Sequence, residues 1–184
     1  MKTACSSGAR PARSPSADTC GTTRVSAPAA ELKDQVASPT VPLLDLASDQ
    51  IGPLLVASEA EGFRFLRRVV GEWEAGTNRF TRKGEALLGN FVDDRLVAIC
   101  GLMRDPYQGE ATVGRLRNLY VLPEYRGRAI GAALARRVIE LAESSFKVLR
   151  LRAGTPQAAV LYERLGFTPT TELKDCTHVM YFES

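Results

Sequence analysis

The sequence predicts a mixed α/β fold with antiparallel strands in its middle, and three observations support this. The chain has 184 residues, a length typical of one domain. Apolar residues make up 45% of it, which is ordinary for a protein with a buried core. Strand-like apolar runs alternate with stretches of helical periodicity. The expected order of elements is β, α, β, β, β, α, β, α, β, β.

Two parts of different composition are expected along the chain. Residues 1–40 are rich in Ser, Ala, Pro and Thr and contain no aromatic residue. Such a segment buries too little apolar surface to offset its chain entropy, so we expect a disordered extension. A faint resemblance to an organelle transit peptide is the alternative. The folded domain is expected to span residues 41–184.

The domain is predicted to begin with a strand and a helix. Residues 41–46 form an apolar run and are predicted as the first strand. Ser58 and Glu61 fit the S-x-x-E pattern of a capping box, which predicts that a helix begins there. This helix is expected to end at Gly76. Its apolar stripe consists of Phe63, Leu66, Val70 and Trp73.

The middle of the chain is predicted to form consecutive antiparallel strands. Two apolar runs, 86–92 and 96–102, surround the acidic pair Asp93 and Asp94. Two such runs around a short turn predict a β-hairpin. A further strand is expected at 113–122, which completes the meander.

The C-terminal half is predicted to alternate between helices and strands. Helical spacing continues after residue 129, and a strand follows at 148–152. Thr155 is a suitable N-cap, Pro156 a suitable first helical residue, and Gly166 a suitable end for a second helix. Short strands are expected at 167–171 and 179–182. The first of these helices carries Ile130, Leu134, Val138 and Leu141 on one face.

Charge and cysteine spacing exclude several classes of function. The net charge is only +3, and part of it lies before residue 41, so the domain lacks the basic excess of a nucleic-acid-binding protein. No apolar run is long enough to cross a membrane, and the first residues contain no apolar signal core. We therefore expect a cytoplasmic protein without nucleic-acid or membrane partners. The cysteines lack paired metal-binding spacing, so we expect reduced thiols and no metal; they are Cys5, Cys20, Cys100 and Cys176.

The segment 126–131 has the chemistry of a phosphate-binding loop. It follows a strand, is rich in small residues, and leads directly into the helix predicted from Ile130. Small residues allow close backbone approach, and the first N–H groups of a helix lack internal partners and favour an anion. Arg126 and Arg128 can add positive charge. A tight turn whose glycines serve only packing is the alternative. Neither the G-x-x-x-x-G-K-[ST] nor the G-x-G-x-x-G phosphate loop is present.

This segment resembles motif A of the GCN5-related N-acetyltransferase (GNAT) family, [QR]-x-x-G-x-[GA]. Arg126 matches its first position and Gly131 its last, whereas Ala129 stands where the family usually has glycine. A second family motif is recognisable in residues 158–167. Thr155 replaces an asparagine that family members often carry. The resemblance extends over nearly all of residues 41–184.

The resemblance implies a fold and a co-substrate, acetyl-CoA. The central sheet would be mixed and mostly antiparallel, flanked by helices, and would splay open between the strand ending at Val121 and the strand 148–152. The pantetheine arm would lie in that opening and pair with the backbone, since its two amides need partners once buried. The residues implied in acetyl-CoA binding are Leu119, Tyr120, Val121, Arg126, Gly127, Arg128, Ala129, Ile130, Gly131, Ala132, Thr155 and Ala158.

Tyr162 is the catalytic candidate. It shares a helix face with Ala158 and Leu165. In the family a tyrosine at this place protonates the departing CoA thiolate, and a phenol and a thiolate are close enough in basicity for this transfer. The alternative is a core tyrosine with a satisfied hydroxyl.

The acceptor side is less well defined by sequence. The resemblance implies that the helix carrying Trp73 borders the acceptor pocket. Glu85, Asn118 acting through a water, and His178 are candidates for the group that takes the amine proton, and His178, the only histidine, has a suitable pKa. A structural role for His178 is the alternative.

Four arginines alternate on two predicted strands, and we expect them on solvated strand faces. The alternative is attraction of the CoA 3′-phosphate or of an acidic acceptor. They are Arg115, Arg117, Arg150 and Arg152.

Together the motifs predict transfer of an acetyl group from acetyl-CoA to a primary amine of a small molecule, by a monomer or homodimer. The alternatives are a protein or peptide acceptor and a non-catalytic acyl-CoA-binding module.

Overall fold

A computed structural model describes residues 40–183 of the chain. The disorder expected before residue 41 therefore lies, save for Thr40, outside the described residues. The elements follow one another as β1 Thr40–Pro42, α1 Ser48–Ala60, α2 Phe65–Glu74, β2 Ala86–Val92, β3 Arg95–Arg104, β4 Val113–Val121, a 3₁₀ turn Pro123–Tyr125, α3 Ile130–Glu143, β5 Val148–Leu151, α4 Pro156–Arg164, β6 Thr168–Pro169 and β7 His178–Tyr181.

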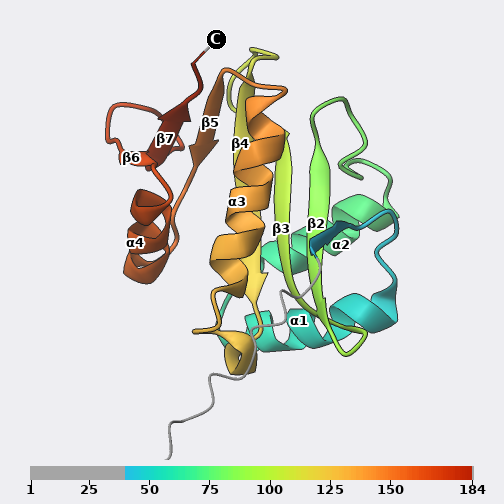
Figure 1. Cartoon of the computed structure of the whole chain (residues 1–184). Helices are drawn as coiled ribbons and strands as arrows, with labels where there is room; N and C mark the ends of the chain where they lie inside the picture. The colour runs from blue at the N-terminus through green and yellow to red at the C-terminus, as the bar shows by residue number, and fades with distance from the viewer. Residues whose placement is uncertain (1–39, 184) are drawn as a thin grey trace, which may run out of the picture. The chain divides into compact units, whose positions relative to one another are not determined.

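The strands form a single seven-stranded sheet in the order β1-β2-β3-β4-β5-β7-β6. All neighbours are antiparallel except β4 and β5, which are parallel. The crossover between those two strands is α3, which lies on one face of the sheet, while α1 and α2 lie on the other (Figure 1). The predicted fold class, a mixed and mostly antiparallel sheet flanked by helices, is confirmed.

Several local predictions are also confirmed in detail. The β2–β3 hairpin turns at Asp93 and Asp94, whose φ angles of 48° and 61° lie in the left-handed region that Asp tolerates better than most residues. Thr155 caps α4, because its Oγ1 accepts a hydrogen bond from the N–H of Ala158 at 3.2 Å. Pro156 is the first residue of α4, and Gly166 follows its end with φ 96°.

The predicted helix start at Ser58 and Glu61 is wrong, because a helix already occupies Ser48–Ala60. Ser58 lies in its last turn, where its hydroxyl donates to the carbonyl of Leu55 at 2.9 Å. Gly52 and Pro53 read as helix breakers in the sequence. Here burial of Ile51 and Leu54, 1% and 0% exposed, outweighs the propensity cost. The first strand is also shorter than the predicted 41–46.

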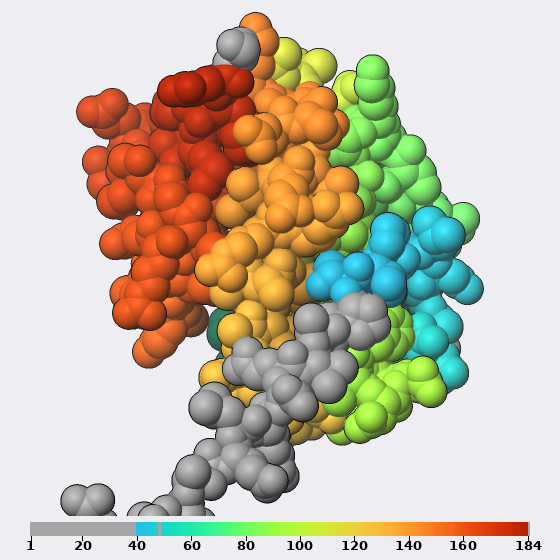
Figure 2. All heavy atoms as spheres, in the orientation of Figure 1, coloured from blue at the N-terminus to red at the C-terminus, as the bar shows by residue number. Residues whose placement is uncertain are grey.

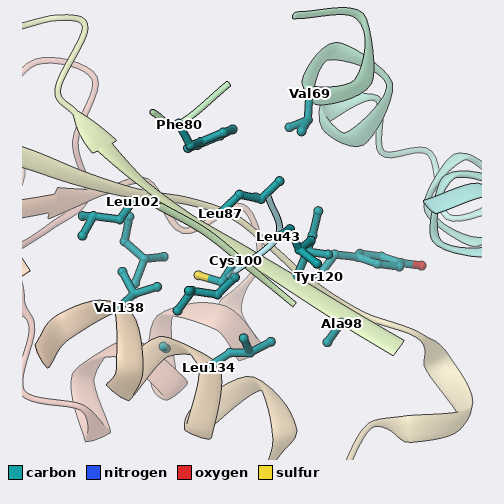
Figure 3. Packing of buried hydrophobic residues seen from close by; sticks show 14 of the residues in the cluster. Leu43, Val69, Phe80, Leu87, Ala98, Cys100, Leu102, Tyr120, Leu134 and Val138 are labelled. Atoms are coloured by element: carbon teal, nitrogen blue, oxygen red, sulfur yellow. The ribbon is translucent and has the colours of Figure 1, made fainter. Parts of the chain in front are cut away.

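Both faces of the sheet carry apolar side chains that join one core (Figure 3). Leu134 and Val138 point from α3 onto one face, and Val69 and Phe80 cover the other. Leu102 in the central strand β3 is fully buried between the two layers. This core fixes β3 and β4 firmly, so β4 can carry a functional edge beyond the point where it leaves β5.

Candidate active site

A cavity of about 780 Å³ opens beside β4, where that strand diverges from β5. In the space-filling view the surface is hollowed between α4 and the N-terminal end of α3 (Figure 2). The lining residues come from the connection between α1 and α2, from β4, from the phosphate-loop region, and from the end of β5 through α4. They include Glu61, Phe63, Phe65, Tyr107, Arg115, Arg117, Asn118, Leu119, Tyr120, Arg126, Arg152, Thr155, Ala158 and Tyr162.

The opening in the sheet arises because β4 and β5 pair over only three residues of each strand. The register joins Val113–Arg115 to Val148–Arg150 and stops there. A bulge in β4 follows: Asn118 has φ 60°, and Asn118 and Leu119 together face Cys100 of β3. From this point to Val121 the free edge of β4 presents backbone groups that β5 does not pair. Such an edge can accept an extended ligand with amide groups.

The N-terminus of α3 supplies free backbone donors at the end of this edge. The first helical hydrogen bond of α3 runs from the N–H of Ala133 to the carbonyl of Ala129 at 3.0 Å. The N–H groups of the preceding helical residues therefore have no backbone partner within residues 40–183. Ala129 precedes the helix in the left-handed region, with φ 60°. Gly127 also has a positive φ, 76°. The two positive φ angles turn the chain so that consecutive N–H groups face the same side, which suits a phosphate group.

Close packing explains the glycine at position 131. A Cβ built there would lie 3.3 Å from Cγ2 of Val121 on β4. A larger side chain would therefore separate the helix from the strand edge, and would cover the N–H groups that surround it.

Arg126 is held in place rather than left free at this loop. Its guanidinium donates to both carboxylate oxygens of Glu61, at 2.8 and 2.7 Å, and to the carbonyl of Val121 at 3.0 Å. It also lies over the ring of Tyr120, whose hydroxyl is 3.3 Å from Glu61. The guanidinium hydrogen bonds hold the pKa of the Glu61 carboxyl below its usual value. Arg128 is exposed and lies over the ring of Tyr125.

Tyr162 of α4 lines the other side of the cavity. Its side chain is buried, and its ring packs edge-on against Phe167 with 5.7 Å between centroids. No side chain or backbone group in residues 40–183 forms a hydrogen bond with its hydroxyl. Burial raises the pKa of this phenol far above its usual value. Tyr162 therefore carries its proton at any physiological pH and can offer it only to a ligand or a water in the cavity.

Comparison with known proteins agrees with this geometry. Residues 87–169 match the model of the acetyltransferase (GNAT) domain. The chain contains a GNAT acetyltransferase domain. No curated protein matches the sequence.

Solved structures share the GNAT fold along most of both chains. A protein from Exiguobacterium sp. 255-15 assigned as an acetyltransferase superposes with a TM-score of 0.69 and 29% identity, covering 78% of this chain and 92% of its own. A GNAT-family acetyltransferase from Staphylococcus aureus Mu50 gives 0.60 and 15%, covering 79% and 100%. The ribosomal-protein-S18-alanine N-acetyltransferase from Escherichia coli gives 0.54 and 18%, covering 79% and 92%.

The candidate acceptor-side residues of the GNAT domain lie in different surroundings. Asn118 lines the cavity, and its Nδ2 is buried with no hydrogen-bond partner in the described part of the chain. Glu85 lies at the start of β2, where it accepts a hydrogen bond from the N–H of Arg104 at 3.2 Å. Neither Glu85 nor Trp73, which is buried in α2, is among the cavity residues. Of these three side chains, only Asn118 is positioned to contact a ligand in the cavity.

His178 lies one layer behind the cavity. Its ring is 6.3 Å from that of Tyr162, between centroids, but it does not line the cavity. Its Nδ1 is 2.8 Å from Oγ1 of Thr177, and its Nε2 is 3.6 Å from a carboxylate oxygen of Glu163. With 4% exposure, the imidazole could reach a reacting amine only through intervening groups.

The expectation of two solvated arginine faces is wrong for Arg115 and Arg150. Both are buried and share one carboxylate: Oδ2 of Asp105 lies 3.2 Å from Arg115 and 3.4 Å from Arg150. Arg115 also donates to the carbonyl of Asp175 and lies over the ring of Tyr107. Parallel pairing brings the two arginines side by side, because position 115 is in register with position 150.

Sequence reasoning missed Asp105 and the aromatic wall of the cavity. Asp105 follows β3 directly and is 2% exposed, but an Asp before a proline is an ordinary turn residue in a sequence. Phe63, Phe65 and Tyr107 line the cavity, although Phe63 is part of a predicted core stripe. No local signal distinguishes these roles, because each depends on contacts between segments far apart in the chain.

Within residues 40–183, no group of three His, Cys, Asp or Glu side chains could hold a metal ion. The same part of the chain contains no helix that is long and apolar enough to span a membrane. Cys100 and Cys176 are free and buried, and burial raises the pKa of the Cys100 thiol well above its usual value. Cys5 and Cys20 lie outside the described residues.

Proposed function

We propose that this GNAT domain transfers the acetyl group of acetyl-CoA to the primary amine of a small molecule. The observation that carries the proposal is the continuity of one cavity. The cavity begins at Arg126, near the free N–H groups of α3, and follows the edge of β4 that β5 leaves unpaired. It ends at Tyr162. A pyrophosphate, an amide-containing arm and a thioester need these three surroundings in this order.

The fit to acetyl-CoA rests on backbone groups of this chain. The N–H groups at the start of α3 would bind the pyrophosphate, and the free edge from Leu119 to Val121 would pair with the amides of the arm. Gly131 keeps the two surfaces in contact. This arrangement would bring the thioester to the bulge at Asn118, beside Tyr162.

The transfer proceeds by direct attack. The neutral amine nitrogen forms a bond with the thioester carbonyl carbon, and the carbon–sulfur bond breaks. The thiolate that leaves takes the phenolic proton of Tyr162, the amine gives up one proton to solvent, and the phenolate of Tyr162 regains one proton from solvent, so no net proton is released. Burial disfavours an anionic phenol, but it disfavours a thiolate in the same cavity for the same reason, so the proton can pass between them.

The cavity favours a small acceptor over a folded protein. The whole cavity measures about 780 Å³, and the arm of acetyl-CoA would occupy part of it, so the space that is left suits a small acceptor. Aromatic side chains from the connection between α1 and α2 and from the β3–β4 loop border it. The Escherichia coli neighbour named for a ribosomal protein is only 18% identical, so it supports the fold and not the acceptor.

Replacing Tyr162 with Phe tests the acid. The ring contact with Phe167 does not need the hydroxyl, so folding and acetyl-CoA affinity should stay close to those of the unchanged protein. Loss of a positioned acid should lower kcat by about 10²- to 10⁴-fold. Tyr181→Phe is the control, because Tyr181 is 69% exposed. Full turnover in Tyr162→Phe would show that another group protonates the thiolate.

An acceptor screen tests the function itself. Thiol release from acetyl-CoA is followed with amines, amino acids, polyamines and aminoglycosides. Calorimetry measures acetyl-CoA affinity in parallel. Acetyl-CoA binding with no transfer to any of these amines would favour the acyl-CoA-binding module, and transfer only to peptides would favour the protein acceptor.

A further inference from the structure

Positive side chains outnumber negative side chains in the lining of the cavity. Four arginines line it, Arg115, Arg117, Arg126 and Arg152, against the single carboxylate of Glu61. Glu61 is bound to Arg126, and Asp105 behind the cavity wall pairs with Arg115 while it also contacts Arg150. Of the four lining arginines, Arg117 and Arg152 are the two without a close carboxylate partner, because the contact of Arg152 with Asp175 is 3.9 Å long.

Arg117 has no anionic partner of its own. In the described part of the chain no carboxylate lies within 4.0 Å of it, and its Nη1 lies 3.1 Å from the weak acceptor Sδ of Met103. On α2, Glu72 and Arg68 act on the charge of Arg117 in opposite directions, and neither forms an ion pair or a hydrogen bond with it in residues 40–183. The Glu72 carboxylate accepts a hydrogen bond from Asn78 instead.

A partly buried cation in this state is unfavourable. Burial lowers the pKa of the Arg117 guanidinium, which nevertheless stays charged at neutral pH. The solvation that Arg117 loses on burial is replaced only weakly, by the sulfur of Met103 and by the more distant charge of Glu72. An anionic ligand in the cavity would restore that lost interaction.

Arg152 is the second arginine of the cavity lining without a close carboxylate partner. It is exposed, and its contact with Asp175 is 3.9 Å long, so it can turn towards a ligand at little cost. A guanidinium presents a planar fork of donors that matches a carboxylate.

The position of Arg117 separates it from the donor's phosphates. Arg117 precedes the bulge at Asn118, whereas the free N–H groups of α3 lie beyond Val121, at the other end of the free β4 edge. An arm that pairs with Leu119 to Val121 would bring its thioester to the bulge. Arg117 would then lie on the acceptor's side of the reacting carbon, together with Arg152.

We infer that the acceptor is a small amine that carries a carboxylate, bound by Arg117 and Arg152, and an apolar body, packed against Phe63, Phe65 and Tyr107. Amino acids with apolar side chains have this chemistry. The inference rests on the proposed function, because it names the class of amine that the same cavity accepts.

Matched pairs of acceptors test the inference. The values of kcat/KM are measured for leucine, methionine and phenylalanine and for the corresponding amino acid amides. The amide removes the negative charge and leaves the amine, and because it lowers the pKa of that amine it raises the fraction that is neutral. We expect kcat/KM to be about 10- to 100-fold higher for the acids, the range for one hydrogen bond to a charged group. Arg117→Gln should reduce this ratio to threefold or less, because kcat/KM should fall much more for the acids than for the amides.

Arg137→Gln is the control, because Arg137 is exposed on α3 and pairs only with Glu140. It removes the same charge and should keep the preference for acids. Equal kcat/KM for acids and amides in the unchanged protein would overturn the inference, and so would a preference that survives in Arg117→Gln.

A binding measurement separates this inference from the proposed function. Calorimetry with CoA present compares N-acetyl amino acids with N-acetyl amino acid amides, and it needs no turnover. Tighter binding of the acids, lost in Arg117→Gln, supports the anion site even if no amine is acetylated. Equal binding of both, in a protein that does acetylate amines, overturns the anion site and leaves the acetyltransferase function intact.

Discussion

The two ends of the cavity differ in the groups that form them: backbone groups at one end and side chains at the other. The end at α3 depends on backbone: free N–H groups, two left-handed residues and a glycine packed against Val121. The end at Arg117 depends on side chains from α2, β3, β4 and β5 and from the loops between them. In the proposed function, the first would bind any ligand with the right phosphate and amide groups. The second can be changed one side chain at a time, which is where specificity for an acceptor can vary on a common fold.

The difference also separates local from long-range stabilisation. The backbone end is formed mainly by one stretch of chain, from Val121 at the end of β4 to the first turn of α3, so most of its geometry depends on residues close together in sequence. The side-chain end needs a buried charge cluster, in which Asp105 holds Arg115 and Arg150 together. Substitutions at the two ends should therefore affect different measurements.

The largest effect is expected for Asp105→Asn. The change keeps the shape and the acceptor oxygen for the N–H of Tyr107, but it leaves Arg115 and Arg150 buried without their shared anion. Removing one partner of a buried ion pair costs about 3 kcal/mol or more. Thermal denaturation should show a fall in Tm of about 10 °C.

Asp45→Asn is the matched control, since Asp45 is exposed and bonds only its neighbour's N–H. Acetyl-CoA affinity of folded Asp105→Asn at low temperature should stay near its original value. A large loss of that affinity would mean that the two ends are not separately built.

Gly131→Val is expected to do the opposite of Asp105→Asn: it should lower acetyl-CoA affinity and have less effect on stability. The added side chain enters the space within 3.3 Å of Val121 and covers the free N–H groups of α3. Calorimetry should show acetyl-CoA affinity reduced by about tenfold or more, because each hydrogen bond to a charged group contributes about 1.5–3 kcal/mol. Ala133→Val places the same side chain on the exposed side of α3 as a control. Unchanged affinity in a folded Gly131→Val protein would contradict the assignment of the loop.

The smallest effect is expected for Ala129→Gly. Ala129 has φ 60°, a conformation that costs an L-residue about 1–2 kcal/mol and glycine much less. Glycine also gains freedom in the unfolded chain, so the net rise in the free energy of unfolding should be at most about 1 kcal/mol. Urea denaturation measures it, and acetyl-CoA affinity should not fall. A decrease in stability would show that Ala129 makes contacts worth more than its strain.

The same contrast explains what the sequence could predict. Thr155, Pro156 and Gly166 delimit α4, and Asp93 and Asp94 form the hairpin turn, because capping and turn preferences depend on a few consecutive residues. The helix Ser48–Ala60 was missed because its stability comes from burial of Ile51 and Leu54 against strands that lie far along the chain.

The candidate site divides in the same way. Arg126 to Gly131 could be predicted as a phosphate loop from spacing, since the loop is local, and Tyr162 as the acid from its place in the second motif; both roles stay predictions. That Arg126 is bound to Glu61, or that Arg115 and Arg150 share Asp105, could not be predicted, because these pairs join separate elements. Sequence alternation identified all four arginines but not which of them a carboxylate neutralises.

The pair formed by Glu61 and Arg126 has a mechanical consequence. Glu61 belongs to the segment that carries Phe63 and Phe65, whereas Arg126 begins the loop that leads into α3. Two parallel hydrogen bonds fasten these segments to each other across the mouth of the cavity. Neither can swing outward alone: a movement of the aromatic wall either breaks both bonds or pulls the loop with it. The Glu61–Arg126 pair thus couples movement of the aromatic wall of the cavity to movement of the loop that leads into α3.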